Sequence, residues 1–497
     1  MADTIALMRK RVLDMAIRGE LVDQLPEEES ANTLIEEIIL EKKRRKKGVN
    51  ISMVPDAEKP FDLPKNWRWI KFGDLVHFQI GKTPARGNRT FWDNGTYPWV
   101  SIADMSNGKI LNNTKETVSE EAKDIVFKGG ISPRGTLIMS FKLTIGKLAI
   151  LDMDAFHNEA IISIYPNHGE SDTIRDYLFY IINALDLLRD TKAAIKGATL
   201  NKTSLNEILV PLPPLAEQKR IVAKIEEIFA VIDQIGTKKE EALGIIKNMR
   251  QTALQDAIMG VLVEQDETDE PASELYEKIK NEKEKLVKEK KIKKEKPLPE
   301  IEENETPFDI PESWKWVRFN NILDIRDGTH DTPKYHKEGI PLITSKNLRS
   351  GDIDFTNIKY ISEEDHRKIS ERSKVDNGDI LFAMIGTIGN PVLVNTEAEF
   401  SIKNVALFKN YPDKNVETKY ILYFLKAIEK QLKEEASGAV QSFLSLTYLR
   451  KLLIPLPPIA EQYRIIEKLD EIMSIFDQME AILDGTSETS NVLGVAE

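Results

Sequence analysis

A long internal repeat constrains the fold of this chain more than any other feature of its sequence. The segment Phe61 to Leu75 (FDLPKNWRWIKFGDL) returns as Phe308 to Leu323 (FDIPESWKWVRFNNIL), 247 residues further on. The segment Ile208 to Ile235, which contains PLPPLAEQKRIV, returns as Leu452 to Met479 at an offset of 244 residues. A repeat of this size means that one structural unit is used twice. The chain is therefore a tandem duplication.

The N-terminus also belongs to the repeat, because Met8 to Gln24 aligns with Met249 to Gln265. One unit then reads helix, basic linker, globular domain and helix start. Two such units in tandem place a long helical segment in the middle of the chain and split the matching segment between its two ends. We therefore expect a pseudo-twofold ring of two α/β domains joined by antiparallel coiled-coil struts.

The helical struts are predicted by local signals. Pro213-Pro214 before Leu215 is typical of a helix start. Apolar residues then recur at a spacing of three to four, as in a helix seam: Ile221, Ile225, Ile228, Ile232 and Ile235, and in the second copy Ile465, Leu469, Ile472, Ile475 and Met479. Gly236 and Gly244 weaken the central helix and permit a kink or short break there.

The two globular segments read as mixed α/β. Short apolar runs predict strands at 135–141, 147–151 and 160–165, with counterparts at 379–384, 391–394 and 406–408, and helices at 172–194 and 417–436. The expected division is an N-terminal helix and basic linker (1–60), a first globular domain (61–214), a central helix and charged linker (215–307), a second globular domain (308–458) and a C-terminal helix (459–497). The charge-dense stretches 42–47 and 278–296 read first as solvated helix ends and linkers, and second as DNA contacts.

Several kinds of chemistry have no signal in the sequence. Cysteine is absent, which excludes disulfides and thiolate metal sites and suits a reducing cytoplasm. The six histidines show no helical pairing, so we expect no metal site, and neither a GxxxxGK[ST] nor a GxGxxG string occurs. The sequence contains no run of 18 apolar residues, so it predicts no membrane span. The formal net charge is -12, yet residues 61–210 carry 18 Lys and Arg against 17 Asp and Glu, so the acidity lies mostly elsewhere.

Polar loops are the remaining candidate chemistry. Gly81 to Arg89 holds three cations among small polar residues and is matched by Gly328 to Lys334. Cations and amides read base edges or bind phosphates, although a solvated surface loop has the same composition. Ser140 to Gly146 (SFKLTIG), matched by Ala383 to Gly389 (AMIGTIG), fits a tight turn and a DNA-facing loop equally well. Trp67, Trp69, Trp314 and Trp316 are expected to pack the strand that opens each domain, in preference to stacking on bases.

These residues together carry a family resemblance. Two variable domains, each opening near FDLPKNWRW and closing in P-L-P-P-[LI]-A-E-Q-x-R-I before a helix, resemble the specificity subunit (HsdS) of a Type I restriction-modification system. The resemblance covers essentially the whole chain. It implies a non-catalytic subunit whose two domains each read one half of a bipartite, asymmetric sequence in double-stranded DNA, while the helices set the gap between the halves.

The resemblance also implies partners. The helices would dock two methyltransferase (HsdM) subunits, and restriction/translocase (HsdR) subunits would complete an adenine methyltransferase and ATP-dependent endonuclease used in phage defence. S-adenosylmethionine, ATP and magnesium would belong to those partners, with no cofactor on this chain. The residues expected to contact DNA are Lys82, Thr83, Arg86, Arg89 and Lys142 in the first domain and His330, Lys334, Lys346, Asn347 and Arg349 in the second. The residues expected to mark the partner-binding helices are Ile221, Ile225, Ile228, Ile232, Ile465, Leu469 and Ile472.

Two alternatives from other classes remain at this point. One is an enzyme whose catalytic site has no familiar spacing, and incubation of the isolated chain with a methyl donor and DNA would reveal it. The other is a non-catalytic scaffold of two modules that bind protein, which the near-neutral recognition segments leave open. Binding of duplex DNA separates this scaffold from a DNA-reading subunit.

Overall fold

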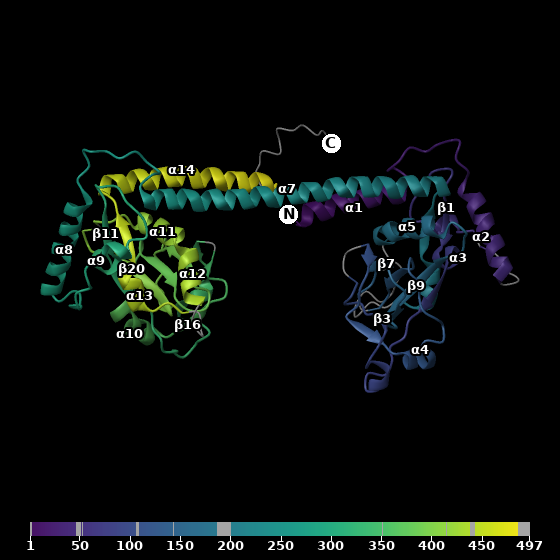
Figure 1. Cartoon of the computed structure of the whole chain (residues 1–497), viewed down its shortest axis with the longest axis horizontal. Coiled ribbons are helices and arrows are strands. Elements are labelled where there is room, and N and C mark those ends of the chain that lie inside the picture. The colour runs from purple at the N-terminus through teal and green to yellow at the C-terminus, as the bar shows by residue number, and fades with distance from the viewer. Residues whose placement is uncertain are drawn as a thin grey trace. The chain divides into compact units, whose positions relative to one another are not determined.

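A computed structural model describes residues 2–45, 51, 53–105, 109–142, 144–185, 200–349, 351–413, 415–437 and 443–485. The chain divides into two compact units, Met1–Lys238 (unit 1) and Lys239–Glu497 (unit 2), whose elements are labelled in Figure 1. The boundary falls inside one helix, α7 (Leu215–Met259), so each unit contains a part of it.

In unit 1, the strand that opens the domain pairs antiparallel with the strand that closes it. These strands are β1 (Arg68–Lys71) and β10 (Leu209–Leu212), and α7 begins directly after the second. Between them lie a five-stranded sheet, in the order β2-β9-β6-β7-β4, and a three-stranded sheet, in the order β5-β3-β8. The bounds are β2 (Val76–Ile80), β3 (Tyr97–Val100), β4 (Ile110–Leu111), β5 (Glu116–Val118), β6 (Leu137–Ser140), β7 (Leu148–Leu151), β8 (Phe156–His157) and β9 (Ile161–Pro166). The helices are α1 (Ala2–Arg18), α2 (Ala31–Arg45), α3 (Phe72–Leu75), α4 (Glu120–Val126), α5 (Ser171–Ile181) and α6 (Lys202–Glu207).

Unit 2 repeats this plan. Its opening and closing strands, β11 (Lys315–Arg318) and β21 (Leu453–Leu456), pair antiparallel, and α14 (Ile459–Asp484) follows. The sheets have the orders β12-β20-β17-β18, β16-β13-β19 and β14-β15. Their strands are β12 (Asp324–Asp327), β13 (Ile340–Thr344), β14 (Leu348–Arg349), β15 (Asp352–Ile353), β16 (Lys359–Ile361), β17 (Ile380–Ala383), β18 (Gly389–Leu393), β19 (Ser401–Lys403) and β20 (Val405–Lys409). The helices are α8 (Ala272–Lys288), α9 (Phe319–Ile322), α10 (Glu363–Ser373), α11 (Thr418–Ala427), α12 (Glu429–Ser437) and α13 (Leu446–Lys451).

The six predicted strands are confirmed as β6, β7 and β9 in unit 1 and β17, β18 and β20 in unit 2. The predicted helix at 417–436 is divided between α11 and α12. The one predicted at 172–194 is observed as α5 and a short 3-10 turn, and its last part lies outside the described residues. The tandem α/β class predicted from the repeat therefore holds.

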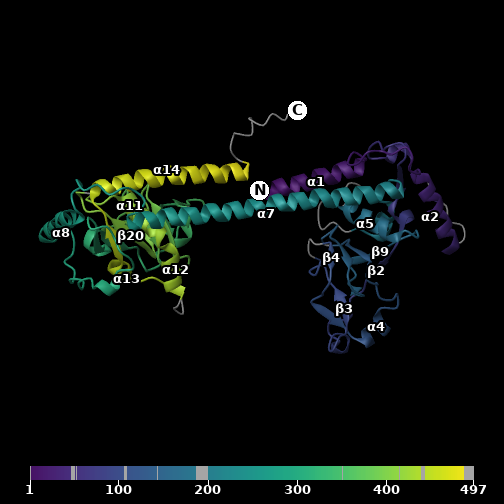
Figure 2. The same cartoon turned by 45° about the horizontal axis from the view of Figure 1, so that its top comes forward.

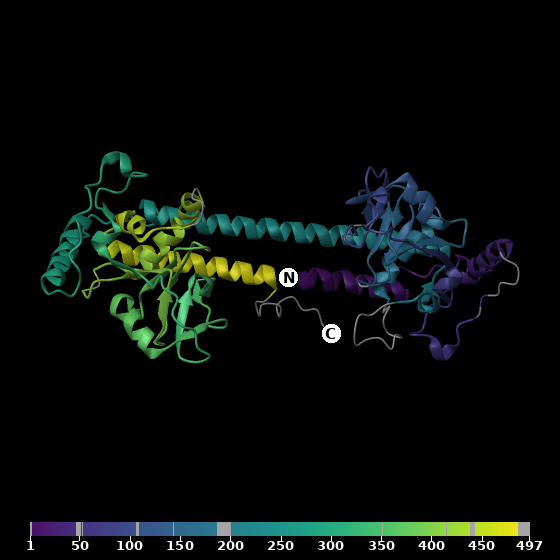
Figure 3. The ribbon, with the colours of Figure 1, turned by 90° about the horizontal axis from the view of Figure 1, so that it is seen from below.

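Each unit contains an antiparallel helix pair. In unit 1, Arg9 of α1 contacts Asp233 and lies over the Phe229 ring at 4.6 Å, while Gln24, beyond the end of α1, reaches Glu217 near the start of α7. In unit 2, Arg250 of α7 pairs with Asp477 of α14 at 2.6 Å, and Lys239 pairs with Asp484 at 3.4 Å. Figure 2 shows α14 beside the last part of α7, and the view from below shows α1, in purple, running along α7, in teal (Figure 3). The predicted antiparallel pairing is present inside both units.

Glycines shape these helices in two different ways. The break that Gly236 and Gly244 permit is absent, because α7 is continuous through both. At Gly236 an added Cβ would lie 3.0 Å from Ile5 Cδ1, so the glycine lets α1 approach α7 closely. Gly19 and Gly260, which are equivalent in the repeat, follow the ends of α1 and α7 with φ of 74° and 75°. A side chain at either would also collide with Pro64 or Pro311, which explains why both copies carry glycine.

The repeated Ala-Glu-Gln string fastens each long helix to its domain. Glu217 is buried and accepts hydrogen bonds from Trp67 Nε1 at 2.9 Å and from Gln24 Nε2. In unit 2, Glu461 accepts from Trp314 Nε1 at 2.8 Å and from Gln265 Nε2. Burial raises the pKa of both carboxyls, and these hydrogen bonds oppose the rise. Trp67, Trp69 and Trp314 are buried, as the predicted packing role requires, and Trp316 is half-buried.

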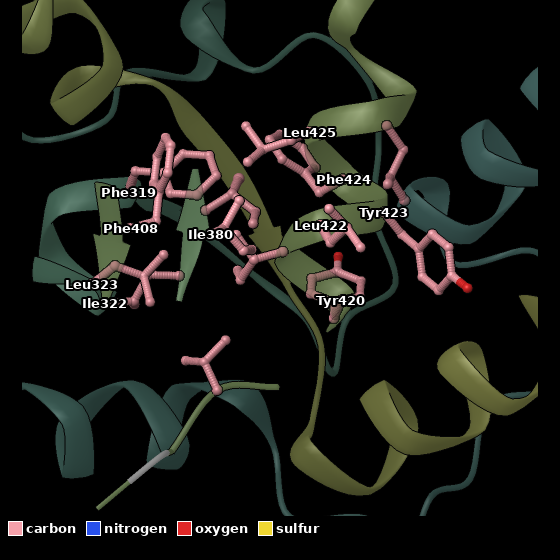
Figure 4. Packing of buried hydrophobic residues seen from close by; sticks show 14 of the residues in the cluster. Phe319, Ile322, Leu323, Ile380, Phe408, Tyr420, Leu422, Tyr423, Phe424 and Leu425 are labelled. Atoms are coloured by element: carbon pink, nitrogen blue, oxygen red, sulfur yellow. The ribbon is translucent and has the colours of Figure 1, made fainter. Parts of the chain in front are cut away.

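A continuous apolar core joins the sheet, α11 and the start of α14 in unit 2. Figure 4 shows Phe319, Phe408 and Phe424 from this core, and the Phe319 ring centroid lies 5.5 Å from each of the other two. Tyr420 is fully buried among them and donates its hydroxyl to Pro455 O at 2.7 Å. In unit 1, Tyr177 makes the same bond to Pro211 O at 2.6 Å. The candidate loops described next extend from these cores.

Candidate nucleic-acid interface

The first candidate loop is pinned to the end of β2 by its own backbone. Gly81 N donates to Ile161 O at 3.1 Å, and Lys82 N donates to His157 O at 2.8 Å. An added Cβ at Gly81 would lie 2.1 Å from His157 O, so only glycine allows this close approach. Lys82 and Arg89 are exposed beyond this anchor. The loop is therefore an ordered projection that presents cations to solvent.

Arg86 is the most organised cation of this loop. Its guanidinium donates to both oxygens of Glu116, with Nη2 at 3.0 Å from Oε2, and lies 4.0 Å from the Trp92 ring centroid and 4.9 Å from that of Trp99. The hydrogen bond to Glu116 raises the pKa of Arg86 further above its ordinary value. A planar guanidinium held in this way is oriented before any ligand arrives.

Other candidate residues of the first domain interact with Glu159. The Thr83 hydroxyl donates to its carboxylate, and this bond lowers the pKa of Glu159, with smaller contributions from the positive charges of Lys142 and Arg86. Lys142 follows β6, and its Nζ lies 5.2 Å from the Phe141 ring centroid. The structure thus joins Thr83 directly to Glu159, and the charges of Lys142 and Arg86 act on the same carboxylate from further away.

The described residues of SFKLTIG, all but Leu143, form a loop that returns to the end of β6. Gly146 N donates to Ser140 O at 2.9 Å, and Gly146 has φ of 87°. Gly389, its counterpart in unit 2, has φ of 100°. The positive φ expected of a glycine in a turn is therefore observed at Gly146, and the DNA-facing alternative stays a prediction.

The second candidate loop has the same anchor as the first. Gly328 N donates to Val405 O at 2.9 Å, and Thr329 N donates to Ile402 O at 3.0 Å. His330 follows, with Nε2 at 2.8 Å from Asp327 Oδ2 and Nδ1 at 3.2 Å from Asn404 Oδ1. The exposed loop residues then include Lys334. The two domains therefore present equivalent loops with different side chains, as expected of two readers of different sequences.

A second group in unit 2 follows β13. Lys346 and Arg349 are exposed, and Arg349 Nε donates to Lys346 O at 2.9 Å. Asn347 is instead buried, contrary to the expectation that it faces DNA: its Oδ1 accepts from Thr344 N at 3.0 Å and its Nδ2 donates to Asp354 O at 3.1 Å. A buried amide that is satisfied within the turn stabilises the turn and is not available to a base.

The apolar stripe of the long helices also has a different role from the one expected. Ile221, Ile225, Ile232, Ile465 and Leu469 are buried in the cores of their own units, and Ile228 and Ile472 pack against those cores. The five buried side chains therefore stabilise the units and are not open to a partner, whereas Ile472 also lines a surface groove. Other members of the stripe are exposed, namely Ile235 in unit 1 and Ile475 and Met479 in unit 2, and Val231 is exposed as well. In unit 2, Ile475 borders a groove of about 570 Å³ together with Ile245 and Met249.

Two residues of the candidate sites have no sequence signal of their own. Glu159 and Lys403 lie in the corresponding connections, one after β8 and the other at the end of β19. Each binds a threonine of its recognition loop, Thr83 for Glu159 and Thr332 for Lys403. Because these partners are more than 70 residues apart in sequence, only the folded chain reveals the pairs. The first loop therefore carries a carboxylate where the second carries an ammonium group.

Among the residues that the structure describes, no group of three or more histidine, aspartate or glutamate side chains is arranged to hold a metal ion. No helix in the described ranges is long and apolar enough to cross a membrane.

Comparison with known proteins gives consistent matches across the chain. Residues 64–243 and 311–484 match the family model described as "Type I restriction modification DNA specificity domain". The chain is 26% identical to the specificity subunit of the type I restriction enzyme EcoAI of Escherichia coli, covering 98% of this chain and 92% of the relative. It is 26% identical, with the same coverage, to the EcoEI specificity subunit of Escherichia coli. A solved chain from a structural study of complex assembly and conformational transition of the type I R-M system superposes with a TM-score of 0.60 at 20% identity, covering 86% of this chain and 95% of that one.

Proposed function

We propose that each α/β domain of this chain reads one half of a bipartite, asymmetric DNA site. The chain belongs to the type I restriction-modification DNA specificity family and so recognises DNA sequence in such a system. The observation that carries this proposal is the pair of loops anchored identically after β2 and β12, each with its own set of polar side chains. Equal anchors with unequal side chains suit two readers of different half-sites. Base edges in the major groove are distinguished by such donors and acceptors.

The side chains of the two loops support different base preferences. The residues that we propose contact DNA are Lys82, Thr83, Arg86, Arg89 and Lys142 in the first domain and His330, Lys334, Lys346 and Arg349 in the second. Arginine and lysine pair with guanine, whereas a carboxylate such as Glu159 accepts from the amino group of cytosine. Glu159 and Lys403 thus extend the proposed reading surfaces of their respective domains.

The helices would serve the partners. Family members named as specificity subunits are not the catalytic subunits, and we propose that two methyltransferase subunits dock on the exposed apolar faces of the two helix pairs. These faces occupy equivalent positions in the repeat: Val231 corresponds to Ile475, and Ile235 to Met479. The methyltransferases would flip the target adenine into their own pockets and bind S-adenosylmethionine, while restriction subunits would use ATP and magnesium. This assembly is proposed to act in the cytoplasm, and the long helices to fix the gap between half-sites.

The test is a domain exchange read by methylation mapping. Residues 61–210 are replaced by the equivalent segment of a relative with a different known site, and the complex with the methyltransferase is used to methylate genomic DNA. Only one half of the methylated sequence should change, because base contacts specify locally. Exchange of residues 308–454 is the matched control and should change only the other half. A change in both halves from either exchange, or no sequence-specific methylation by the unaltered complex, would contradict the proposal.

A further inference from the structure

Unit 2 contains a strongly basic cavity that the reading of bases does not use. It has a volume of about 760 Å³ and lies among α8, the segment that follows α8, β12, α10 and α13. Eight lysine and arginine side chains line it against four carboxylates. Two of these lysines, Lys291 and Lys368, pair with Glu289 and Glu364 outside the lining, which leaves an excess of two positive charges in a chain whose formal net charge is -12. A local excess of this sign in an acidic protein indicates a polyanionic ligand.

The carboxylates of the cavity are largely neutralised by cations that they already bind. Glu295 lies 3.5 Å from Lys283 Nζ and 3.4 Å from Arg450 Nη1. Asp324 pairs with Arg326 at 2.6 Å, and Asp327 accepts from Arg372. These pairs fix the walls, because Arg450 also donates to Ile325 O at 2.7 Å and Lys283 Nζ donates to Asn320 O.

Two lysines at the edge of this framework remain available. Lys293 and Lys294 follow α8, are exposed, and form no ion pair with any residue in the part of the chain that the structure describes. A lysine ammonium is a compact charge on a flexible stem and binds phosphate without fixed geometry. The cavity thus combines a rigid arginine-lined wall with two mobile ammonium groups, an arrangement that suits phosphate oxygens.

The cavity is joined to the second recognition loop through one side chain. Asp327 lines the cavity and also lies 2.8 Å from His330 Nε2, at the start of the loop proposed to read bases. The wall of the cavity at Asp327 therefore lies directly beside this loop. Phosphodiester groups that flank the second half-site would reach Lys293 and Lys294.

We infer that this cavity binds phosphates of the DNA backbone beside the second half-site, and that the segment after α8 contributes to this binding. The inference rests on the proposed function, since it requires that the second loop faces DNA. It adds a contact that supplies affinity and register without sequence information, because phosphate contacts position a protein and base contacts specify. Part of the stretch 278–296 then contacts the DNA backbone, which was the second of the two interpretations that its charge allowed.

The test uses the full chain in complex with its methyltransferase and a duplex that carries the mapped site. The variant Lys293→Ala/Lys294→Ala removes the two available cations. The matched control, Lys285→Ala/Lys288→Ala, removes the same charge from exposed positions of α8 that do not line the cavity. Affinity is measured over a series of salt concentrations, and the methylated sequence is mapped for each protein.

We expect the salt slope of the cavity variant to fall by about two, at about 0.9 per phosphate contact, with the methylated sequence unchanged. The control should keep the slope of the unaltered protein. Replacing flanking phosphates of the second half-site by neutral methylphosphonates should weaken binding of the unaltered protein and leave the cavity variant unaffected.

Equal slopes for the cavity variant, the control and the unaltered protein would overturn the inference while leaving the proposed function intact. An unaltered complex that shows no preference for any DNA sequence would instead overturn the proposed function. ATP and inorganic triphosphate are added as competitors in a further arm. If either binds the unaltered protein, is lost from the cavity variant and leaves the DNA salt slope unchanged in both, the cavity holds a free phosphate ligand and the inference is wrong.

Discussion

Replacing Arg86 by alanine separates two contributions of one side chain, to the fold of unit 1 and to DNA binding. The pair with Glu116 is half exposed, at 54% and 40% for the two side chains, so it stabilises unit 1 by only about 0.2–1 kcal/mol. The guanidinium over Trp92 adds about 0.5–1 kcal/mol. Arg86→Ala should therefore lower the free energy of unfolding of unit 1 by about 1–2 kcal/mol and leave the domain folded.

The effect on DNA binding depends on what Arg86 contacts. A bidentate contact to guanine would cost about 1–3 kcal/mol when lost, about 5- to 150-fold in affinity, and would relax one position of the first half-site. A phosphate contact would weaken all sites alike and flatten the salt slope by about one. We expect the first outcome, because Glu116, Trp92 and Trp99 fix the plane of the guanidinium, and a fixed plane matters for a base edge more than for a phosphate.

The assay is titration of the methyltransferase complex with duplexes that vary at each position of the first half-site, at several salt concentrations. Arg86→Lys keeps the charge and loses the fork, so it should behave like alanine at a base contact and like the unaltered protein at a phosphate contact. Arg134→Ala is the matched control, because Arg134 also forms an exposed pair in unit 1, with Asp152 at 2.7 Å. If Arg86→Ala binds every duplex as Arg134→Ala does at all salt concentrations, Arg86 does not contact DNA.

Three other perturbations have defined outcomes. Tyr177→Phe and Tyr420→Phe each remove one buried hydrogen bond to a proline carbonyl, so each should destabilise its own unit by about 1 kcal/mol in calorimetry, and an effect on the other unit would contradict the assignment. Burial lowers the pKa of His157 to about 4, so on acidification the unfolded chain binds a proton at this histidine before the folded chain does. The free energy of unfolding of unit 1 should therefore fall by up to about 3 kcal/mol as the pH drops from about 6.5 toward 4. Denaturant unfolding at a series of pH values checks this, and His157→Gln should abolish that part of the slope. Four residues inserted after Ile235 should lengthen α7 by about 6 Å and the gap between half-sites by one or two base pairs. An unaltered gap with full activity, in methylation mapped on a library of gap lengths, would show that the helix does not set the spacing.

Much of the architecture could be predicted because its causes are local or repeated. The strands β6, β7 and β9 and their counterparts follow from short apolar runs, and the starts of α7 and α14 follow from the Pro-Pro pairs before them. The tandem plan follows from the repeat alone. The break that Gly236 and Gly244 permit in α7 does not occur, and at Gly236 the packing of α1 offsets a glycine cost of about 1 kcal/mol.

The candidate site could be predicted only in part. The composition of the loops after β2 and β12 predicted them as candidate DNA contacts. Lys82, Arg86 and Lys334 are exposed there. Asn347 has the same polar character as these residues, yet its turn uses the amide internally. Composition indicates which side chains can bind a base but does not indicate which are already bound by the protein.

The sequence by itself determined the duplication, the α/β class, the helices and the family, since each depends on periodicity, local propensity or repeated strings. Only the tertiary structure decided which surfaces are free. The apolar stripe of α7 has helical periodicity whether it faces a partner or its own domain, and the fold buries Ile221 and Ile225 in unit 1. The pairing of Glu159 with Thr83 and the basic cavity beside Asp327 likewise join segments that are distant in sequence. Periodicity specifies a face of an element, whereas what covers that face depends on long-range packing.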